Sequence, residues 1–302
     1  MLRSVEFSTD AAGAAAGTLL NLNGYSVLGE IYKPAIADGC INGVEMIGLR
    51  GLPQRMEEFK RSFGDRLEIR CVHGRTGNLP TSGDRSKTRI ILQTANTLMV
   101  PTQELLNGIK GYKDVAVLFH RPELDGSGSK LIFPENKRVW VENHTEGIPE
   151  LKETVVLVED LRERGVNAGV IIDFCHVIGS VDLQNGRFPD RWRNLMDQLK
   201  NFRKEFKPRE PIPWGIHVAW GTEPSDSLPL TDKTGKVRQE ILDDIAVVID
   251  GEITGMPIER VVFECQSEKV ADLFIPNKAT VGQLTDRFGV IYEDCQEAGI
   301  LG

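Results

Sequence analysis

The sequence lacks the features that mark membrane, secreted and nucleotide-binding proteins. Its longest apolar stretches, such as Ala168–Ile172 and Ile245–Ile249, are far shorter than the roughly 18–20 residues of a membrane helix. The amino-terminal MLRSVEFSTD is charged and has no apolar core, so we expect no secretory signal and no membrane partner. There is no Gly-x-Gly-x-x-Gly after the first apolar run, and GKS, GKT, Gly-x-Ser-x-Gly and HExxH are all absent. These absences disfavour the common phosphate-binding loops, a serine-hydrolase elbow and a zinc-protease helix.

Cysteine is scarce as well, since the chain has five, an odd number with no CxxC pair. Four of them lie in or beside apolar runs, where a thiol usually packs as a small hydrophobic group. Free thiols are typical of a reducing compartment, so we expect a cytoplasmic protein. Cys175 stands beside His176, but a buried structural thiol is a commoner role for such a residue than a nucleophile.

The charge balance is acidic, with 36 Lys and Arg against 44 Asp and Glu and a net charge of −8. Proteins that coat nucleic acid bind it by neutralising phosphates, so this balance disfavours that class, although a locally basic cleft stays open. The composition is 40% hydrophobic and 26% charged, which is typical of a soluble globular chain. No linker, repeat or low-complexity tract divides residues 1–302, so we expect one domain.

Short runs rich in β-branched residues alternate along the chain with polar loops and segments of helical period. We expect strands at Ser4–Ser8, Gly43–Leu49, Leu67–His73, Asp114–His120, Arg138–Glu142, Ala168–Asp173, Pro213–Trp220 and Arg260–Cys265. We expect helices at Ala11–Tyr25, Val27–Ala37, Gln54–Phe63, Lys87–Gly111 with a break before Pro101, Ile148–Gly165, Pro189–Phe206, Val237–Gly251 and Val281–Ala298. Eight strands that alternate with helices predict a single (β/α)8 barrel, and an open doubly wound sheet is the alternative. The segment Arg121–Lys137 has no helical period, and we expect a loop over the barrel mouth there.

All five histidines end or closely follow a predicted strand. They are His73, His120, His144, His176 and His217, and the carboxylates Glu142, Asp173 and Glu264 occupy similar positions. In a (β/α)8 barrel the carboxyl ends of the strands converge on one pocket, so we expect these side chains to meet. A carboxylate at the end of an apolar strand is costly to bury without a cation. Mixed imidazole and carboxylate ligands suit Zn²⁺, Mn²⁺ or Fe²⁺, so the pattern predicts a divalent-metal site.

Three further residues are candidates for contact with the substrate. Arg75 and Arg121 follow His73 and His120 and could hold a phosphate or carboxylate, or simply be solvated loop charges. Trp220 could stack on a sugar or base, although packing at the rim is the commoner role of such a tryptophan.

At these residues the sequence resembles the xylose-isomerase-like TIM barrel superfamily. The fragments that carry the resemblance are VHGRTGNL, VLFH, VWVENHTEG, VIIDFCHV, GIHV and VVFECQ, in this order over about two-thirds of the chain. That superfamily includes divalent-metal sugar isomerases and epimerases, and AP endonuclease family 2 enzymes of the zinc-dependent endonuclease IV type. The resemblance implies that Glu142, Asp173, His217 and Glu264 form a four-ligand metal site.

The two branches of the superfamily imply different roles for the same residues. In the epimerase-like branch His176 contacts the substrate, and Glu142 and Glu264 are the catalytic residues that remove and return a proton next to the carbonyl. In the endonuclease-like branch His73 and His120 join a zinc cluster that activates water for attack on a phosphodiester. That branch has an Asp-x-His pair after the seventh strand, whereas here GTEPSDSLPL offers Asp226 and Leu228. Leucine cannot bind metal, which argues against a complete three-zinc site.

We therefore expect an isomerase or epimerase of a sugar or sugar-like small molecule that depends on Mn, Zn, Co or Mg. The alternatives are a zinc phosphodiesterase acting on abasic DNA, a non-catalytic barrel, and an iron-dependent oxidase. Nucleic acid is a partner only under the phosphodiesterase alternative, and a homo-oligomer is compatible with the sequence.

Overall fold

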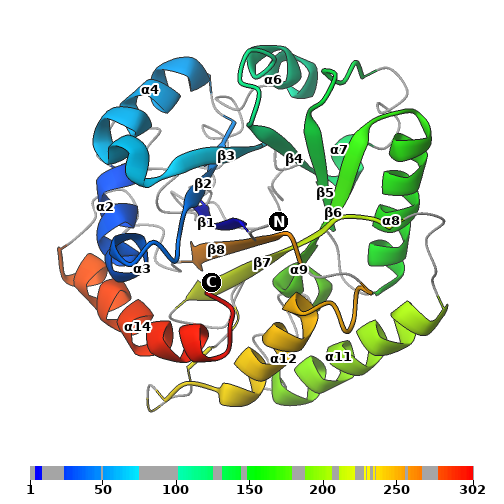
Figure 1. Cartoon of the computed structure of the whole chain (residues 1–302). Helices are drawn as coiled ribbons and strands as arrows, with labels where there is room; N and C mark the ends of the chain where they lie inside the picture. The colour runs from blue at the N-terminus through cyan, green and yellow to red at the C-terminus, as the bar shows by residue number, and fades with distance from the viewer. Residues whose placement is uncertain are drawn as a thin grey trace, which may run out of the picture.

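The computed structural model describes residues 4–8, 24–48, 50–74, 101–124, 131–143, 148–178, 188–205, 211–221, 228, 230–231, 234, 236–255, 258–266 and 278–301. Eight strands in this part of the chain form a closed, all-parallel barrel in sequence order (Figure 1). They are β1 (Ser4–Ser8), β2 (Gly43–Ile47), β3 (Glu68–His73), β4 (Ala116–His120), β5 (Arg138–Glu142), β6 (Asn167–Asp173), β7 (Trp214–Gly221) and β8 (Arg260–Gln266). β8 pairs with β1 from Ser4 opposite Arg260 to Phe7 opposite Phe263, which closes the barrel.

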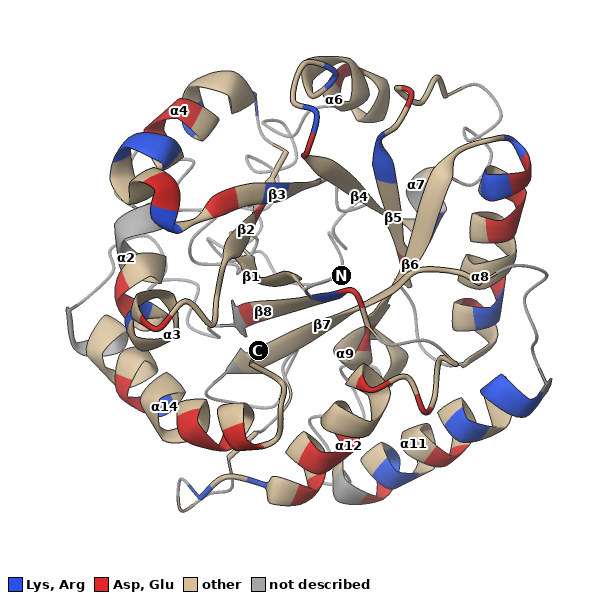
Figure 2. Ribbon diagram, in the orientation of Figure 1, with Lys and Arg blue, Asp and Glu red and all other residues tan. Residues whose placement is uncertain are grey.

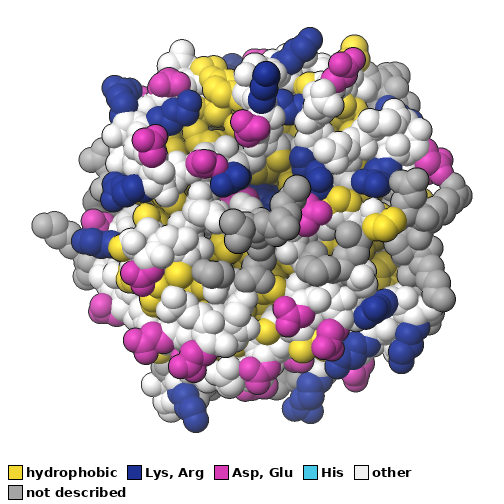
Figure 3. All heavy atoms as spheres, in the orientation of Figure 1, with side chains coloured by type: hydrophobic (Ala, Val, Ile, Leu, Met, Phe, Trp, Pro, Cys, Tyr) yellow, Lys and Arg dark blue, Asp and Glu magenta, His cyan; other side chains and the backbone are white. Residues whose placement is uncertain are grey.

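The helices surround the barrel and cover its outer face (Figure 1). They are α2 (Gly24–Ile31), α3 (Lys33–Ala37), α4 (Leu52–Phe63), η1 (Gly64–Arg66), α6 (Thr102–Gly108), α7 (Arg121–Leu124), α8 (Ile148–Glu163), α9 (Phe174–Ile178), α11 (Phe188–Glu205), α12 (Gln239–Ile249) and α14 (Lys278–Glu297). Figure 2 shows acidic and basic residues concentrated on this helical layer, and in Figure 3 the two signs are interspersed on the face shown, with no histidine in view. No described helix is both long and apolar enough to cross a membrane.

The predicted (β/α)8 architecture is confirmed. Every predicted strand agrees with an observed strand to within two residues at either end. The expected alternative, an open sheet, is wrong because β1 and β8 are hydrogen-bonded neighbours. That the chain is one domain over residues 1–302 stays a prediction.

Two local expectations need correction. The predicted helix Val27–Ala37 is interrupted at Tyr32, between α2 and α3. Pro34 has no N–H to continue the helical ladder, which explains the interruption. The predicted loop Arg121–Lys137 begins with the short helix α7, whose second residue is Pro122. Proline is compatible with a first helical turn, where its missing N–H would have no intrahelical acceptor.

The barrel interior is layered by the two-residue period of its strands. Cys71, Leu118, Trp140 and Ile171 form a buried apolar cluster that is separate from the main core between barrel and helices. Two residues further along the same strands stand His73, His120, Glu142 and Asp173. Since alternate residues of a strand point to the same side, the apolar layer is the floor on which these polar side chains rest. The barrel fold therefore brings these four polar side chains together in its interior.

Gly169 has no side chain, and this leaves room for the ring of Trp140 in the apolar layer. A Cβ atom at this position of β6 would lie 2.6 Å from the Trp140 ring and 2.9 Å from the carbonyl oxygen of Pro213. Gly289, in the exposed face of α14, would meet nothing within 4 Å. The same substitution therefore has opposite consequences at the two positions.

We predict that Gly169→Ala lowers the free energy of unfolding by about 1–3 kcal/mol, because it overpacks the barrel interior. Gly289→Ala is the matched control, and it should raise that free energy by about 0.5–1 kcal/mol, because alanine is the better helix former. Urea unfolding followed by circular dichroism measures both. Equal effects of the two variants would contradict the packing described for Trp140.

Candidate metal centre

Seven predicted side chains meet inside the barrel towards the carboxyl ends of its strands. They are His73, His120, Glu142, Asp173, His176, His217 and Glu264. Strand register places His120 beside Glu142 and Asp173 beside His217. Six of the seven are buried, whereas the side chain of His176 is 35% exposed. The site is thus a buried cluster with one imidazole at its open side.

The Asp-x-x-His spacing is explained by the start of α9. The carboxylate of Asp173 accepts a hydrogen bond from the backbone N–H of His176 at 3.0 Å. This is the contact of a helix N-cap with the third residue of the first turn, and it fixes both side chains at the end of β6. His176 Nδ1 also lies 3.8 Å from Asp173 Oδ2.

Among the described residues, the cluster divides into three groups of potential metal ligands. They are His73, His120 and Glu142; Glu142, Asp173 and His176; and Glu45, His217 and Glu264. In each group one ligand atom per residue lies within 4.8 Å of the others. Glu142 belongs to two of these groups, and its contact with His217 joins it to the third.

Glu142 is the centre of the arrangement because its two oxygens face different histidines. Oε2 lies 3.2 Å from His73 Nε2 and 3.5 Å from His120 Nε2. Oε1 lies 3.3 Å from His217 Nδ1 and 3.6 Å from His176 Nδ1. A carboxylate in this position can contribute one oxygen to each of two neighbouring sites.

His217 has the surroundings of a metal ligand. Its side chain is fully buried, and neither ring nitrogen makes a hydrogen bond of normal geometry to a described residue, although Nε2 lies 3.5 Å from Glu45 Oε2. Nδ1 nevertheless lies 3.3 Å from both Glu142 Oε1 and Glu264 Oε1. Buried polar nitrogens are almost always satisfied, so an imidazole among carboxylate oxygens without hydrogen bonds fits a position that shares a cation with them.

Backbone carbonyls fix the ring orientation of two other histidines. His73 Nδ1 donates to the carbonyl oxygen of Gly74 at 3.1 Å, and His176 Nδ1 donates to that of Asn143 at 2.9 Å. A carbonyl can only accept, so in the neutral rings the lone pair is on Nε2. The lone pair of His73 then faces Glu142 Oε2, which is repulsive unless the ring is protonated or a cation lies between them. Metal-binding histidines are commonly held in this way.

The electrostatics of the metal-free cluster show how strongly it favours positive charge. Burial and the neighbouring carboxylates of Asp173 and Glu142 raise the pKa of Glu264 to about 8, against the effect of His217. Burial disfavours the charged form of His176, but Asp173 and Glu142 outweigh it and raise its pKa to about 9. Burial is likewise outweighed at His217, whose pKa is raised by Glu142, Glu264 and Glu45. Without a metal, protons supply the missing positive charge.

The donor set fits a divalent cation. Carboxylate oxygens and imidazole nitrogens in one buried cluster suit Zn²⁺, Mn²⁺ or Fe²⁺ and give Mg²⁺ fewer oxygen ligands than it prefers. The orphaned Nδ1 of His217 and the raised pKa of Glu264 both mark places where a cation would replace a proton. Metal binding by this cluster is therefore consistent with its geometry and its charge.

Two residues of the site are not predicted from the sequence. Glu45, in β2, lies within the cluster of His217 and Glu264. Its signal was a lone acidic residue in the apolar run Gly43–Leu49, where a carboxylate needs a buried partner. Asn143 donates from Nδ2 to the carbonyl oxygen of Asp173 and accepts from its N–H, so it clamps the end of β5 to that of β6.

The structure does not support Trp220 and Arg121 as substrate ligands. Trp220 is buried outside the barrel, where its ring packs on Phe288 and its Nε1 donates to the Tyr32 hydroxyl. Strand alternation requires this, because His217 points inwards and a residue three positions later points outwards. Arg121 makes ion pairs with Glu150 at 2.9 Å and with Glu153 at 3.0 Å, so its charge is engaged on α8.

Some predicted positions lie outside the described residues. These are Arg75, His144 and Asp226. Leu228 is described, and it is fully buried with its N–H donating to the carbonyl oxygen of Ala219. It packs as a core residue where the endonuclease pattern has a histidine.

The chain has no match among protein families or curated proteins, and it has a distant structural neighbour. Among solved structures, it is similar to the carboxyl transferase domain from Rhizobium etli pyruvate carboxylase with oxalate, with a TM-score of 0.39 and 10% identity. The likeness covers 99% of this chain and 48% of that chain, so this chain spans about half the length of its neighbour. The assignment of a (β/α)8 barrel rests on the closed parallel sheet itself.

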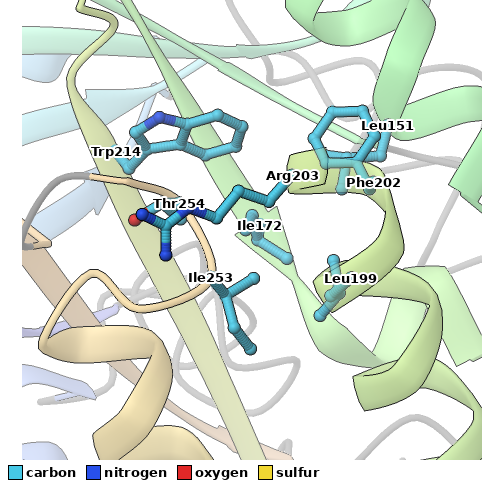
Figure 4. Close-up of a pocket in the computed structure, with 8 residues that line it drawn as sticks. All are labelled: Leu151, Ile172, Leu199, Phe202, Arg203, Trp214, Ile253 and Thr254. Atoms are coloured by element: carbon cyan, nitrogen blue, oxygen red, sulfur yellow. The ribbon is translucent and has the colours of Figure 1, made fainter. Parts of the chain in front are cut away.

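A pocket elsewhere in the structure is not part of this centre. It lies between the barrel and the helices α8 and α11, with Leu151, Leu199 and Trp214 in its largely apolar lining (Figure 4). Arg203 extends across it, and its guanidinium donates to the backbone carbonyl of Glu252. None of the seven cluster residues lines this pocket.

We predict that the metal-free protein loses thermal stability as the pH rises from about 4.5 to 9. The folded-state pKa of His176, about 9, lies above its ordinary value of 6.5, and that of Glu264, about 8, lies above 4.5. A group with a raised pKa stabilises the fold below its unfolded-state value, and that contribution disappears as the pH passes the folded-state value. Calorimetry at several pH values, with and without Mn²⁺ or Zn²⁺, measures the effect. Metal should restore stability at high pH, and a metal-free protein that is most stable at pH 9 would contradict these protonation states.

Proposed function

We propose that the protein is a divalent-metal-dependent isomerase or epimerase of a neutral hydroxy-carbonyl compound such as a sugar. The observation that carries the proposal is the pair of buried carboxylates Glu142 and Glu264, each 3.3 Å from Nδ1 of His217. Two carboxylates beside one cation site are the groups that a proton transfer between neighbouring carbons, or between two faces of one carbon, requires.

The proposed reaction assigns a role to each of these side chains. One glutamate accepts the proton from the carbon next to the carbonyl, and the electron pair of the broken carbon–hydrogen bond moves toward the carbonyl oxygen. For epimerisation, the other glutamate gives a proton to the opposite face of the same carbon as the electron pair returns from the enolate oxygen and the carbonyl re-forms. For isomerisation, the proton goes to the former carbonyl carbon, while the neighbouring hydroxyl becomes the new carbonyl and its proton passes to the former carbonyl oxygen. The chemistry that a bound divalent cation supplies is polarisation of the substrate oxygens, which acidifies that carbon–hydrogen bond. His176, the most exposed histidine of the cluster, is placed to hydrogen-bond the substrate.

A neutral substrate fits the charges around the site. Glu6, Glu45, Glu142, Asp173 and Glu264 are all buried within the barrel. The guanidinium of Arg260 is engaged by Glu6 and Glu45, and Arg121 is engaged on α8. Among the described residues, the cations of the barrel interior and mouth thus already have carboxylate partners. An anionic substrate would have to rely on the metal alone, whereas hydroxyl groups can coordinate a metal without adding charge.

We predict that Mn²⁺-loaded protein catalyses exchange of substrate hydrogen with D₂O when it meets its ketose among a panel of neutral sugars. Glu264→Gln and Glu142→Gln should each lower the exchange rate about 100- to 10,000-fold, because an amide cannot take up the proton. Mass spectrometry of the recovered sugars measures deuterium incorporation.

Glu240→Gln, an identical change at an exposed position of α12, is the matched control and should leave the rate unchanged. Absence of exchange for the whole panel by metal-loaded protein would contradict an isomerase or epimerase. Exchange that survives both glutamine variants would show that these glutamates are not the acid and base.

A second candidate function, hydrolysis of a phosphodiester, is favoured by one specific observation. His73, His120 and Glu142 form a second potential metal site that shares Glu142 with its neighbour. Two adjacent cations can activate water and stabilise the leaving oxygen of a phosphoester. The buried Leu228 and the engaged Arg121 speak against DNA as the substrate.

The two candidate functions can be separated with one variant. We predict that His120→Asn, which removes a ligand of the second site alone, lowers proton exchange less than tenfold. It should abolish any cleavage of a duplex that contains an abasic site, because cleavage needs the second cation. Robust cleavage by wild-type protein that disappears in His120→Asn would replace the isomerase proposal by a hydrolase.

A further inference from the structure

A chain of buried ionic contacts runs from the other end of the barrel interior to the metal centre. It begins at Glu6 in β1, whose two oxygens accept hydrogen bonds from Arg260 Nε at 2.9 Å and Nη2 at 2.7 Å. Arg260 Nη2 also donates to Glu45 Oε2 at 2.5 Å. The same Oε2 lies 3.5 Å from His217 Nε2. All four side chains are at most 3% exposed, so water does not screen these contacts.

The two ring nitrogens of His217 thus face different groups. Nδ1 faces Glu142 and Glu264, which belong to the proposed reaction. Nε2 faces Glu45, on the opposite side of the ring and towards Arg260. In many metal sites a histidine binds the cation through one nitrogen while a carboxylate accepts the proton of the other, which fixes the tautomer and orients the ring.

We propose that Glu45 is a positioning residue that holds the Nε2–H of His217 and so directs the Nδ1 lone pair of that ring to the metal. Arg260 keeps the Glu45 carboxylate ionised and in place, and Glu6 balances the charge of Arg260. The inference rests on the metal centre of the proposed function, but it does not depend on which reaction the centre catalyses.

The contacts of Glu45 distinguish this role from direct coordination. Oε2 is bound to a guanidinium at 2.5 Å, and a cation on the same oxygen would be repelled by that charge. Oε1 accepts a hydrogen bond from the Ser8 hydroxyl at 3.3 Å. Both oxygens therefore have protein donors before any metal binds. The carboxylates of Glu142 and Glu264 have histidines as their described neighbours and carry no arginine contact.

Glu6 offers a matched control for Glu45. Both are buried carboxylates on the same guanidinium, but Glu6 has no contact with His217 among those described. Glu45→Gln leaves Arg260 paired with Glu6, and Glu6→Gln leaves it paired with Glu45, so each variant retains one buried ion pair. The two variants remove the same charge from the same network at different distances from the metal centre.

The test combines metal affinity with the nuclear magnetic resonance of His217 in the full-length, Zn²⁺-loaded chain. Long-range ¹H–¹⁵N spectra identify which nitrogen of each histidine is bound and which carries a proton, and His217→Gln assigns the signal. We expect wild-type His217 to be bound through Nδ1 with its proton on Nε2. Glu45→Gln should lower Zn²⁺ affinity about 10- to 100-fold and speed exchange of the Nε2 proton with water. Glu6→Gln should change the affinity less than threefold and leave the His217 signal in place.

Each contrary result has a distinct meaning. Coordination of wild-type His217 through Nε2 overturns the inference without any variant, as does an unchanged Zn²⁺ affinity of Glu45→Gln. Loss of one oxygen ligand from the zinc X-ray absorption spectrum of Glu45→Gln would make Glu45 a direct ligand and also overturn it. Equal losses in the Glu45 and Glu6 variants would reduce Glu45 to part of a structural network. A wild-type chain that binds Zn²⁺ as expected but catalyses no exchange would remove the isomerase proposal and leave this inference standing.

Discussion

Excess negative charge inside the barrel determines how its polar side chains are arranged. In the part of the chain that the structure describes, five carboxylates are buried there, those of Glu6, Glu45, Glu142, Asp173 and Glu264, against the one buried guanidinium of Arg260. An unpaired carboxylate in an apolar interior is too costly to retain by accident, so each needs a proton, an imidazolium or a cation. Two kinds of side chain balance these carboxylates. Arg260 neutralises the β1–β2 side, and histidines surround the remainder, where a divalent cation can replace protons.

The barrel makes this arrangement possible through the two-residue period of its strands. An apolar floor of Cys71, Leu118, Trp140 and Ile171 lies one step below His73, His120, Glu142 and Asp173. This apolar layer excludes water from one side of the polar cluster. The low dielectric constant there strengthens the electrostatic contacts between the carboxylates and the histidines. The apolar layer and the polar layer are therefore neighbours on the same strands. A substitution that shifts one layer also displaces side chains of the other.

Much of this could be predicted from the sequence because it depends on local periodicity. Continuous apolar runs predict where the strands lie. The polar residue that ends such a run is predicted to belong to the site, and this rule identifies His73, Glu142 and Asp173. Glu45 is not at the end of a run, and only its three-dimensional contacts with Arg260 and His217 explain why it is tolerated. Trp220 shows the opposite error: its aromatic character suggests a ligand, whereas its phase relative to His217 places it outside the barrel. Charge partners such as Glu150 for Arg121 depend on which helix packs beside a loop, and no sequence pattern reveals that.

We propose that the buried carboxylates and imidazoles hold a divalent cation. The most direct test is the metal content of the purified, untagged chain by elemental analysis, before and after reconstitution with Mn²⁺, Zn²⁺, Co²⁺ or Fe²⁺. We expect at least one tightly held equivalent per chain, and loss of that metal when Glu142 is replaced by glutamine in a protein that stays folded. A folded wild-type chain that retains no metal after reconstitution would contradict it, and the charge in the barrel would then have to be balanced by protons alone.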